Sequence, residues 1–195
     1  MDPLHAAFLV FALVIGALRG YYQWRMRHHR PKRRIASMLD RALIAVAVIA
    51  MIPIPLLQIF TPVFVRLDFT LPGLVGWLGV DLLALAALLF WRSHADLGLN
   101  WSMGLEVRHG HTLVDRGVYR YIRHPMYAAL LVAGLGQFLT LQNWVGGSSI
   151  FLAGLVFLVF RVPREERLLL DEFGEAYRTY QARTGRVFPR FSSIF

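Results

Sequence analysis

Long apolar runs separated by short basic segments constrain this chain more than any other feature of its sequence. About twenty apolar residues in a row are needed for a helix to cross the hydrocarbon core of a bilayer. Five runs of roughly that length occur, at residues 3–20, 40–62, 71–91, 125–141 and 144–162. Backbone polar groups inside a bilayer must be satisfied within the segment, so such runs fold as helices. The sequence therefore predicts an all-α, polytopic membrane protein with about five transmembrane helices.

Composition agrees with a membrane protein of one domain. Of the 195 residues, 56% are hydrophobic and 17% are charged, and the mean hydropathy is +0.49. A soluble domain carries about a quarter of charged residues. We therefore expect residues 1–195 to form a single integral-membrane domain. The absence of cysteine excludes disulfides and thiolate zinc sites.

Three of the apolar runs carry features that predict more than a plain helix. Basic residues follow the first run instead of preceding it, which argues against a cleaved signal peptide. Pro53 and Pro55 lie inside the second run and predict a kink. Asp81 lies near the centre of the third run, where a carboxylate is costly, so it is either functional or paired inside the helix bundle.

The basic residues predict how the chain crosses the membrane. Lys and Arg number seven in residues 19–34, five in 92–126 and seven in 161–195, which leaves two of the total of 21. Loops rich in Lys and Arg stay in the cytoplasm. With five spans, this bias places the N-terminus outside and the C-terminus in the cytoplasm, as expected for a prokaryotic inner membrane. The net charge of +9 thus indicates anionic lipid headgroups, and no nucleic-acid partner is expected.

Two long polar segments are expected on the cytoplasmic face. The connection 92–127 enters the helical hairpin formed by the fourth and fifth runs, and the tail 161–195 leaves it. The tail contains one predicted amphipathic helix, at residues 165–183. Since the two segments flank the same hairpin, they must meet in space. The sequence therefore predicts a cytoplasmic site built from the 92–127 connection and the C-terminal tail.

The connection ends in the segment H-T-L-V-D-R-G-V-Y-R-Y-I-R-H-P-M-Y, residues 111–127. Pro125 stands where the fourth apolar run begins, and proline is tolerated in the first turn of a helix because the missing N–H would be unpaired there. Unpaired backbone donors and the positive end of the helix dipole would then face water. Three alternatives remain open: the tyrosines form an interfacial belt, Arg120 and Arg123 set topology, and His124 caps the helix.

Arg161 and Glu165 are four residues apart, so they share a helix face if the helix continues past Pro163. A guanidinium can bind a carboxylate or phosphate with two hydrogen bonds, and a carboxylate can accept from an ammonium group. Alternatively, Arg161 is a cation at a helix end and Glu165 is its salt-bridge partner.

Other chemistries find little support. His28 and His29 are adjacent, and His109 and His111 are two apart, but no acid or cysteine completes a ligand set, so no metal site is predicted. No G-x-S-x-G elbow and no Ser–His–Asp arrangement is present.

Taken together, the motifs resemble the isoprenylcysteine carboxyl methyltransferase family of integral-membrane enzymes, which use S-adenosylmethionine. The resemblance covers roughly residues 92–190 and is closest to the short prokaryotic members with five spans. It rests on His111-Thr-Leu-Val114, Gly117-Val-Tyr119, Arg123-His-Pro-Met-Tyr127, Arg161 with Glu165-Glu166, Phe173-Gly174-x-x-Tyr177-x-x-Tyr180 and Phe188-Pro189.

The resemblance implies a cofactor-binding region at residues 104–127 and 161–190. It implies that the acceptor's carboxylate is positioned by Arg161 and that the amino-acid end of the cofactor is bound by Glu165, which makes these two the candidate catalytic residues. A further contact near Leu105 or Glu106 is not assigned. The implied cofactor contacts are His111, Thr112, Leu113, Val114, Tyr119, His124, Pro125, Met126, Tyr127 and Glu165.

The implied reaction is O-methylation of a carboxylate on a lipidic or prenylated acceptor, with S-adenosylhomocysteine as the product. A carboxylate is ionised at neutral pH and needs no general base. Membrane lipids are the other expected partners, and the oligomeric state is not specified. Three alternatives stay open: phospholipid or amine N-methylation, an NADPH-dependent membrane lipid reductase with a similar R-H-P-x-Y element, and a non-enzymatic membrane anchor or assembly factor.

Overall fold

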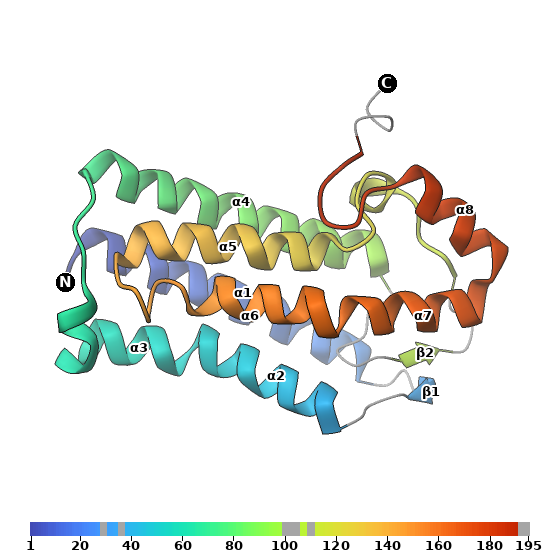
Figure 1. Cartoon of the computed structure of the whole chain (residues 1–195), viewed down its shortest axis with the longest axis horizontal. Helices are drawn as coiled ribbons and strands as arrows, with labels where there is room; N and C mark the ends of the chain where they lie inside the picture. Colours follow the sequence, from blue (N-terminus) through green and yellow to red (C-terminus); the bar gives the residue numbers. More distant parts are fainter. Residues whose placement is uncertain (28–30, 35–37, 99–105, 109–111, 191–195) are drawn as a thin grey trace.

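The computed structural model describes residues 1–27, 31–34, 38–98, 106–108 and 112–190, with backbone alone for 31–34 and 106–108. Figure 1 shows an elongated bundle whose helices run along its long axis. The helices are α1 (Pro3–Met26), α2 (Met38–Met51), α3 (Pro53–Phe60), α4 (Gly73–Leu97), α5 (Pro125–Leu141), α6 (Ser149–Phe160), α7 (Val162–Phe173) and α8 (Glu175–Arg183), with 3₁₀ turns η1 (Pro62–Leu67) and η3 (Gly117–Arg120). The all-α prediction is confirmed.

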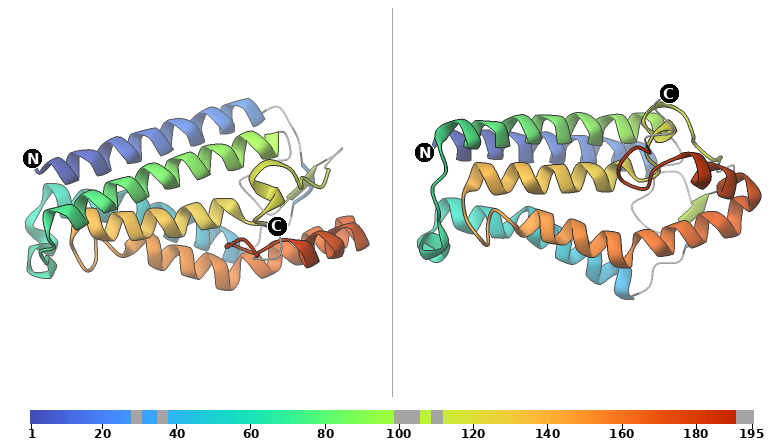
Figure 2. Two further views of the ribbon diagram at one scale, coloured as in Figure 1. Left: turned by 90° about the horizontal axis from the view of Figure 1, so that it is seen from above. Right: turned by 45° about the horizontal axis from the view of Figure 1, so that its top comes forward.

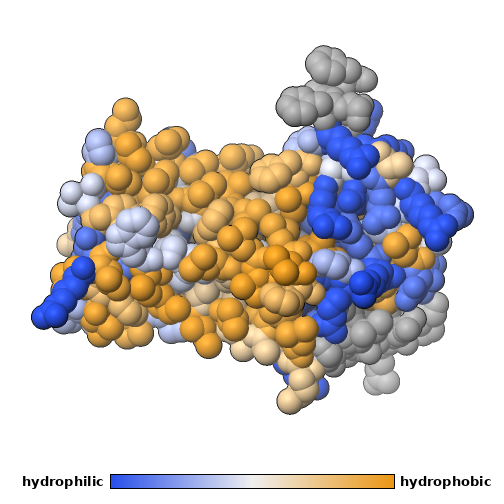
Figure 3. Space-filling model, in the orientation of Figure 1, coloured by the Kyte–Doolittle hydropathy of each residue, from blue (hydrophilic) through white to orange (hydrophobic). Residues whose placement is uncertain are grey.

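The described helices suit a bilayer. Three stretches are long and apolar enough to cross a membrane, namely Pro3–Met26, Met38–Phe60 and Gly73–Leu97, and α5 is a shorter apolar helix. Many of their large apolar side chains are exposed, which water would not favour. Figure 3 shows apolar side chains over the length of the bundle and polar ones gathered at the end that holds α7 and α8. The chain is an integral membrane protein, while its five spans stay a prediction.

The helix boundaries follow local chemistry. The expected kink in the second apolar run is confirmed, because α2 ends at Met51 and α3 begins at Pro53. The helix of the fifth run begins at Ser149 rather than Trp144. There the side-chain oxygen of Asn143 accepts hydrogen bonds from the N–H groups of Val145 (2.9 Å) and Gly146 (2.8 Å), which stabilises a turn in place of a helix.

The single amphipathic helix predicted over 165–183 is wrong. The structure has two helices there, α7 and α8, which meet at Gly174. Gly174 has φ +52°, a backbone conformation that glycine adopts without steric cost and that ends a helix.

Helices α4 and α5 pack backbone against backbone. A Cβ on Gly79 would lie 2.8 Å from the carbonyl oxygen of Gly136, and a Cβ on Gly136 would lie 2.8 Å from that of Gly79. Small residues of this kind allow membrane helices to approach closely. Figure 2 shows α1 beside α4, with α6 and α7 continuing past the end of α5. The α4–α5 pair is therefore the closely packed centre of the bundle, against which α1 and α6 pack.

Two short strands were not predicted. β1 (Pro31–Arg34) pairs antiparallel with β2 (Glu106–Arg108) at the end of the bundle that holds α7. Strands of this length show too few side-chain alternations to be detected from sequence. They join the connection after α1 to the connection after α4.

Asp81 does not pair inside the bundle. Its side chain lies on the exposed face of α4, so the interpretation of a paired bundle carboxylate is wrong. Within the described part of the chain it forms no ion pair.

Candidate active site

The mouth of α5 lies at the polar end of the bundle. Pro125 is in the first turn of α5, as predicted, and His124 is the N-cap residue. The His124 side chain makes no capping hydrogen bond. Instead its buried ring lies against α7, with Nε2 3.3 Å from Oε1 of Glu166 and Nδ1 3.9 Å from Oε1 of Glu165. The position that the sequence predicted for His124 is therefore right, but the cap interpretation of its side chain is wrong.

Glu166 is a buried anchor that joins three segments of the chain. Its carboxylate accepts from Arg123 Nε at 3.1 Å and from Arg186 Nη2 at 2.6 Å, in addition to the contact with His124. Burial alone would raise the pKa of Glu166. The hydrogen bonds from His124 and Arg186, with the charge of Arg123, outweigh burial and lower its pKa to about 2. Glu166 thus stays ionised and connects the mouth of α5 to α7 and the tail.

The tail also pairs with the mouth of α5 through the backbone. The N–H of Arg123 donates to the carbonyl of Gly185 at 2.8 Å, and the N–H of His124 donates to that of Arg186 at 2.9 Å. Gly185 returns a hydrogen bond from its N–H to the carbonyl of Tyr121 at 3.1 Å. The structure therefore brings the end of the 92–127 connection and the C-terminal tail together.

Replacing Glu166 with Gln is expected to destabilise the protein by about 3 kcal/mol at pH 7, because three cationic or protonatable partners lose their carboxylate. The pKa of Glu166 is lowered in the folded state, so its stabilisation is fully present above the ordinary value of 4.5. It is lost as the pH falls towards 2. In detergent, wild type should therefore unfold at a higher temperature than Glu166→Gln, and this difference in unfolding temperature should narrow as the pH falls from 4.5 to 2.

The exposed pair Arg178 and Glu175 provides the matched control for this prediction. Glu175→Gln should leave the unfolding temperature nearly unchanged at every pH. If the difference in unfolding temperature between wild type and Glu166→Gln stays constant down to pH 2, the charge of Glu166 does not stabilise the protein.

Arg161, Tyr127 and Glu165 form a hydrogen-bonded chain. Arg161 Nε donates to the hydroxyl of Tyr127 at 3.0 Å, and that hydroxyl donates to Oε2 of Glu165 at 2.7 Å. The helical path continues past Pro163, since the N–H of Glu165 donates to the carbonyl of Arg161 at 3.0 Å. Arg161 is buried, whereas the side chain of Glu165 is 29% exposed. A buried cation is thus linked through a phenol to a carboxylate that solvent can reach.

Tyr119 adds a polar group beside Glu165. Its hydroxyl is buried and has no hydrogen-bond partner among the described residues. Burial, and then the charge of Glu165, raise the pKa of Tyr119 well above its usual value, so the hydroxyl stays neutral and is available as a donor. A buried donor of this kind is costly without a partner and fits a polar ligand.

Asp96 fixes the turn that carries Tyr119. Asp96 lies in the last turn of α4, and its carboxylate accepts a hydrogen bond from the N–H of Val118 at 2.9 Å. Gly117 has φ +58°, and a Cβ there would lie 2.1 Å from Oδ2 of Asp96. Only glycine therefore fits at the start of η3.

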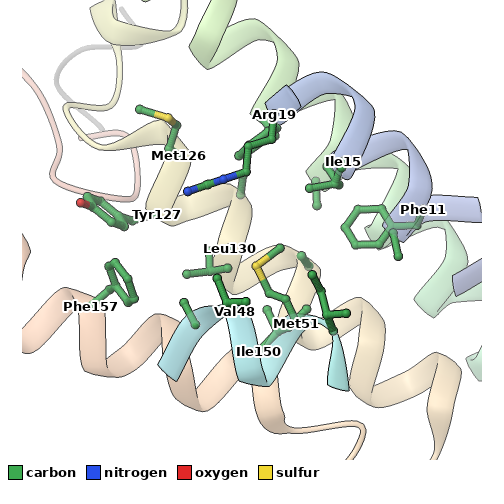
Figure 4. Close-up of a pocket in the computed structure, with 18 of the residues that line it drawn as sticks. Phe11, Ile15, Arg19, Val48, Met51, Met126, Tyr127, Leu130, Ile150 and Phe157 are labelled. Atoms are coloured by element: carbon green, nitrogen blue, oxygen red, sulfur yellow. The ribbon is translucent and has the colours of Figure 1, made fainter. Parts of the chain in front are cut away.

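An apolar pocket of about 290 Å³ opens onto this chain of polar groups. Helix α1 packs against α4 and α5, α2 packs against α6, and the pocket lies between these two walls. Figure 4 shows Tyr127, Met126 and Phe157 towards one end, and Phe11 and Met51 towards the other. The polar side chains that line the pocket are Arg19, His94, Tyr127 and Arg161.

The residues singled out from sequence differ in where the structure places them. His124, Tyr127, Arg161 and Glu165 lie together, and Met126 lines the pocket beside them. On the approach to η3, Thr112 is exposed while Leu113 and Val114 are half-buried. Pro125 is buried. His111 and Leu105 lie outside the described residues, and only the backbone of Glu106, in β2, is described.

Sequence reasoning missed Arg19, His94, Asp96 and Asp40. Arg19 is the first residue of the basic segment 19–34 that is expected in the cytoplasm, but α1 continues to Met26 and Arg19 lies inside this helix. Asp40 is buried and pairs with Arg164 at 2.9 Å, which ties α2 to α7. The available signal was position: Arg19 precedes the main basic run by nearly two helical turns.

The apolar helices define an integral membrane protein, and its pocket is apolar along its length and ends in a hydrogen-bonded Arg–Tyr–Glu chain. Residues 77–171 match the isoprenylcysteine carboxyl methyltransferase family. The resemblance drawn from the motifs is therefore confirmed over these residues.

Individual proteins agree with the family. The chain is 33% identical over 79 residues to the protein-S-isoprenylcysteine O-methyltransferase of Schizosaccharomyces pombe, covering 40% of this chain and 34% of that protein. It is 30% identical over 118 residues to the methanethiol S-methyltransferase of Pseudomonas deceptionensis, covering 58% of this chain and 43% of that protein. The matches thus span less than half of each of these relatives.

A solved structure is similar as well. The eukaryotic intramembrane Ras methyltransferase, an isoprenylcysteine carboxyl methyltransferase, is 25% identical with a TM-score of 0.56. The similarity covers 82% of this chain and 55% of that chain. The shared fold therefore extends beyond the residues matched by the family, into the N-terminal helices that frame the pocket.

Proposed function

We propose that this protein transfers a methyl group from S-adenosylmethionine to the carboxylate of a lipidic acceptor. The observation that carries the proposal is the Arg161–Tyr127–Glu165 chain, because it joins an apolar pocket to a solvent-accessible carboxylate. An amphiphilic acceptor fits the pocket, and a polar cofactor fits the solvent side. The names of the relatives, which act on prenylated cysteine or on methanethiol, support methyl transfer.

The residues at the solvent side fit the cofactor. The partly exposed carboxylate of Glu165 suits the ammonium group of an amino acid, and the buried hydroxyl of Tyr119 offers an unused donor beside it. His124, Pro125 and Met126 would complete this side of the site, with the loop that carries Thr112, Leu113 and Val114. His111, which lies outside the described residues, is also proposed as a cofactor contact. S-adenosylmethionine supplies a methyl group bound to a positively charged sulfur, which carboxylates attack directly.

Arg161 binds and orients the acceptor in this proposal. Its guanidinium is buried at the pocket's polar end, held by the Tyr127 hydroxyl and stacked over the Phe157 ring at 5.4 Å. A carboxylate there is already ionised, so the site needs no general base. The new bond forms between a carboxylate oxygen and the methyl carbon, while the sulfur–methyl bond breaks and yields S-adenosylhomocysteine. Positioning and exclusion of water are the protein's main contributions.

Charge supports a cytoplasmic location for the site. The basic residues of α7, α8 and the tail gather at one end of the bundle, beyond its apolar length. We infer that this end faces the cytoplasm, that the N-terminus is outside, and that the membrane is a prokaryotic inner membrane. The acceptor then reaches the pocket from the bilayer and the cofactor reaches it from the cytoplasm.

Ligand binding tests the proposal against a membrane reductase. Isothermal titration of the purified full-length protein in nanodiscs is expected to show binding of S-adenosylhomocysteine and none of NADPH. Transfer of labelled methyl from S-adenosylmethionine to membrane lipids and to small prenyl-thioether acids should follow. Binding of NADPH alone would overturn the proposal in favour of a reductase, and binding of neither would favour a non-enzymatic role.

A further inference from the structure

Arg19 brings a second guanidinium into the pocket. It lies on α1 and lines the pocket together with Arg161. Figure 4 shows its side chain reaching from α1 into the pocket, towards the end where Tyr127 and Met126 lie. None of the described residues that line the pocket is acidic. In the described part of the chain, Arg19 forms no ion pair.

Two cations facing one apolar pocket are unfavourable by themselves. Arg19 and Arg161 are close enough for their charges to act on each other, and like charges repel more strongly where water is scarce. Glu165 does not line the pocket, and its link to Arg161 runs through the Tyr127 hydroxyl. An inward cation within a membrane helix marks a ligand pathway by default. An anionic group at the polar end of the pocket would therefore be attracted by both guanidinium groups.

We propose that Arg19 binds the anionic headgroup of the acceptor together with Arg161, so that one carboxylate lies between two guanidinium groups. This inference rests on the proposed function and adds to it a specificity-determining residue on α1. A carboxylate has two oxygens and about four lone-pair sites, enough to accept from both arginines. The apolar remainder of the pocket, from Phe8 and Phe11 to Met51 and Ile150, then holds the acceptor's chain.

The arrangement names the class of acceptor. Two cations favour a lipidic acid and disfavour a protonated amine, and they gain nothing from a neutral thiol or amide of the same shape. A neutral headgroup would receive none of the attraction that an anion receives from two guanidinium groups at the pocket's polar end. The acceptor is therefore an apolar chain that ends in a carboxylate, unlike the methanethiol of the Pseudomonas deceptionensis relative.

The test compares an acid with its neutral analogue. Full-length protein in nanodiscs, saturated with S-adenosylhomocysteine, is titrated with N-acetyl-S-farnesyl-L-cysteine and with the carboxamide of the same molecule. We expect the wild type to bind the acid about 10- to 100-fold more tightly, as charged hydrogen bonds allow. Arg19→Gln should reduce this preference to about threefold or less, and Arg19→Lys should retain part of it, because lysine keeps the charge without the planar fork.

Arg25→Gln is the matched control, since Arg25 is an exposed arginine on the same helix and does not line the pocket. It should keep the wild-type preference. Unfolding temperatures separate binding from structure. Without acceptor, Arg19→Gln should unfold at the same or a higher temperature than wild type, because an uncompensated cation has been removed.

The outcomes distinguish this inference from the proposed function. An Arg19→Gln variant that keeps the full preference for the acid, or a wild type that shows none, overturns the role of Arg19, while binding of S-adenosylhomocysteine leaves methyl transfer in place. A wild type that binds no S-adenosylhomocysteine but prefers the acid through Arg19 overturns methyl transfer and supports the anion site. Loss of stability in Arg19→Gln with an unchanged preference assigns Arg19 a structural role only.

Discussion

Replacing Arg161 with Ala is expected to lower kcat/KM for methyl transfer to a prenyl-thioether acid by about 10²–10³-fold. Arg161 is buried at the polar end of the pocket, and it donates a hydrogen bond to the hydroxyl of Tyr127. In the proposed mechanism, its removal takes away the group that orients the carboxylate and also frees Tyr127 to move. Misplacement of a reacting group by about 1 Å already costs about 10²-fold. Steady-state rates with labelled S-adenosylmethionine measure the effect.

Arg167→Ala is the control for this prediction, because Arg167 lies on α7 close to Arg161 in sequence but is exposed. Its kcat/KM should stay within about twofold of wild type, as for other exposed substitutions. Affinity of Arg161→Ala for S-adenosylhomocysteine should also be nearly unchanged. Wild-type rates in Arg161→Ala would remove Arg161 from the site.

Replacing Glu165 with Gln is expected to weaken binding of S-adenosylhomocysteine by about 10- to 100-fold, the range for loss of a charged hydrogen bond. The variant keeps the shape of the side chain and can still accept from Tyr127, so the change tests the charge. Isothermal titration measures the affinity directly. Rates at saturating cofactor should fall much less than rates at low cofactor, because the loss lies in cofactor binding.

Glu166→Gln changes the neighbouring carboxylate and separates an effect on stability from an effect on cofactor binding. Glu166 is bound to Arg123, His124 and Arg186, so its substitution should lower stability more than cofactor affinity in the folded fraction. Glu175→Gln, at an exposed position, should change neither. Equal loss of affinity in Glu165→Gln and Glu175→Gln would show that the effect is general electrostatics and not a specific contact.

Features governed by local chemistry could be predicted from the sequence. Proline cannot donate a backbone hydrogen bond, so Pro53 broke the second apolar run and Pro125 began α5 where expected. The length of the apolar runs likewise predicted an all-α fold, because a backbone inside a bilayer must pair its polar groups within the segment. The end of α7 at Gly174 was missed because glycine within an amphipathic pattern is also tolerated inside a helix, and only its positive φ shows which case applies.

The sequence could predict that residues of the candidate site lie close together, but it could not predict how they are connected. The motifs placed Tyr127, Arg161 and Glu165 in one site, yet nothing in their spacing shows that a phenol lies between the two charges. Spacing also does not separate Glu165 from Glu166, although one faces Tyr127 and the other is enclosed by three basic side chains. The position of Arg19 in the pocket could not be predicted for a different reason. The face of α1 that turns inward depends on its packing against α4 and α5.

The two sides of the pocket are held by different contacts, and this has a consequence for the range of acceptors. One wall is α1, fixed to α4 and α5, and the other is α2, fixed to α6 and held to α7 by the Asp40–Arg164 pair. Because α2 takes no part in the glycine contact of α4 and α5, a tilt of α2 would widen the pocket and leave that contact in place. We therefore expect the pocket to tolerate branching and bulk in the acceptor's hydrocarbon more readily than changes at its reacting end.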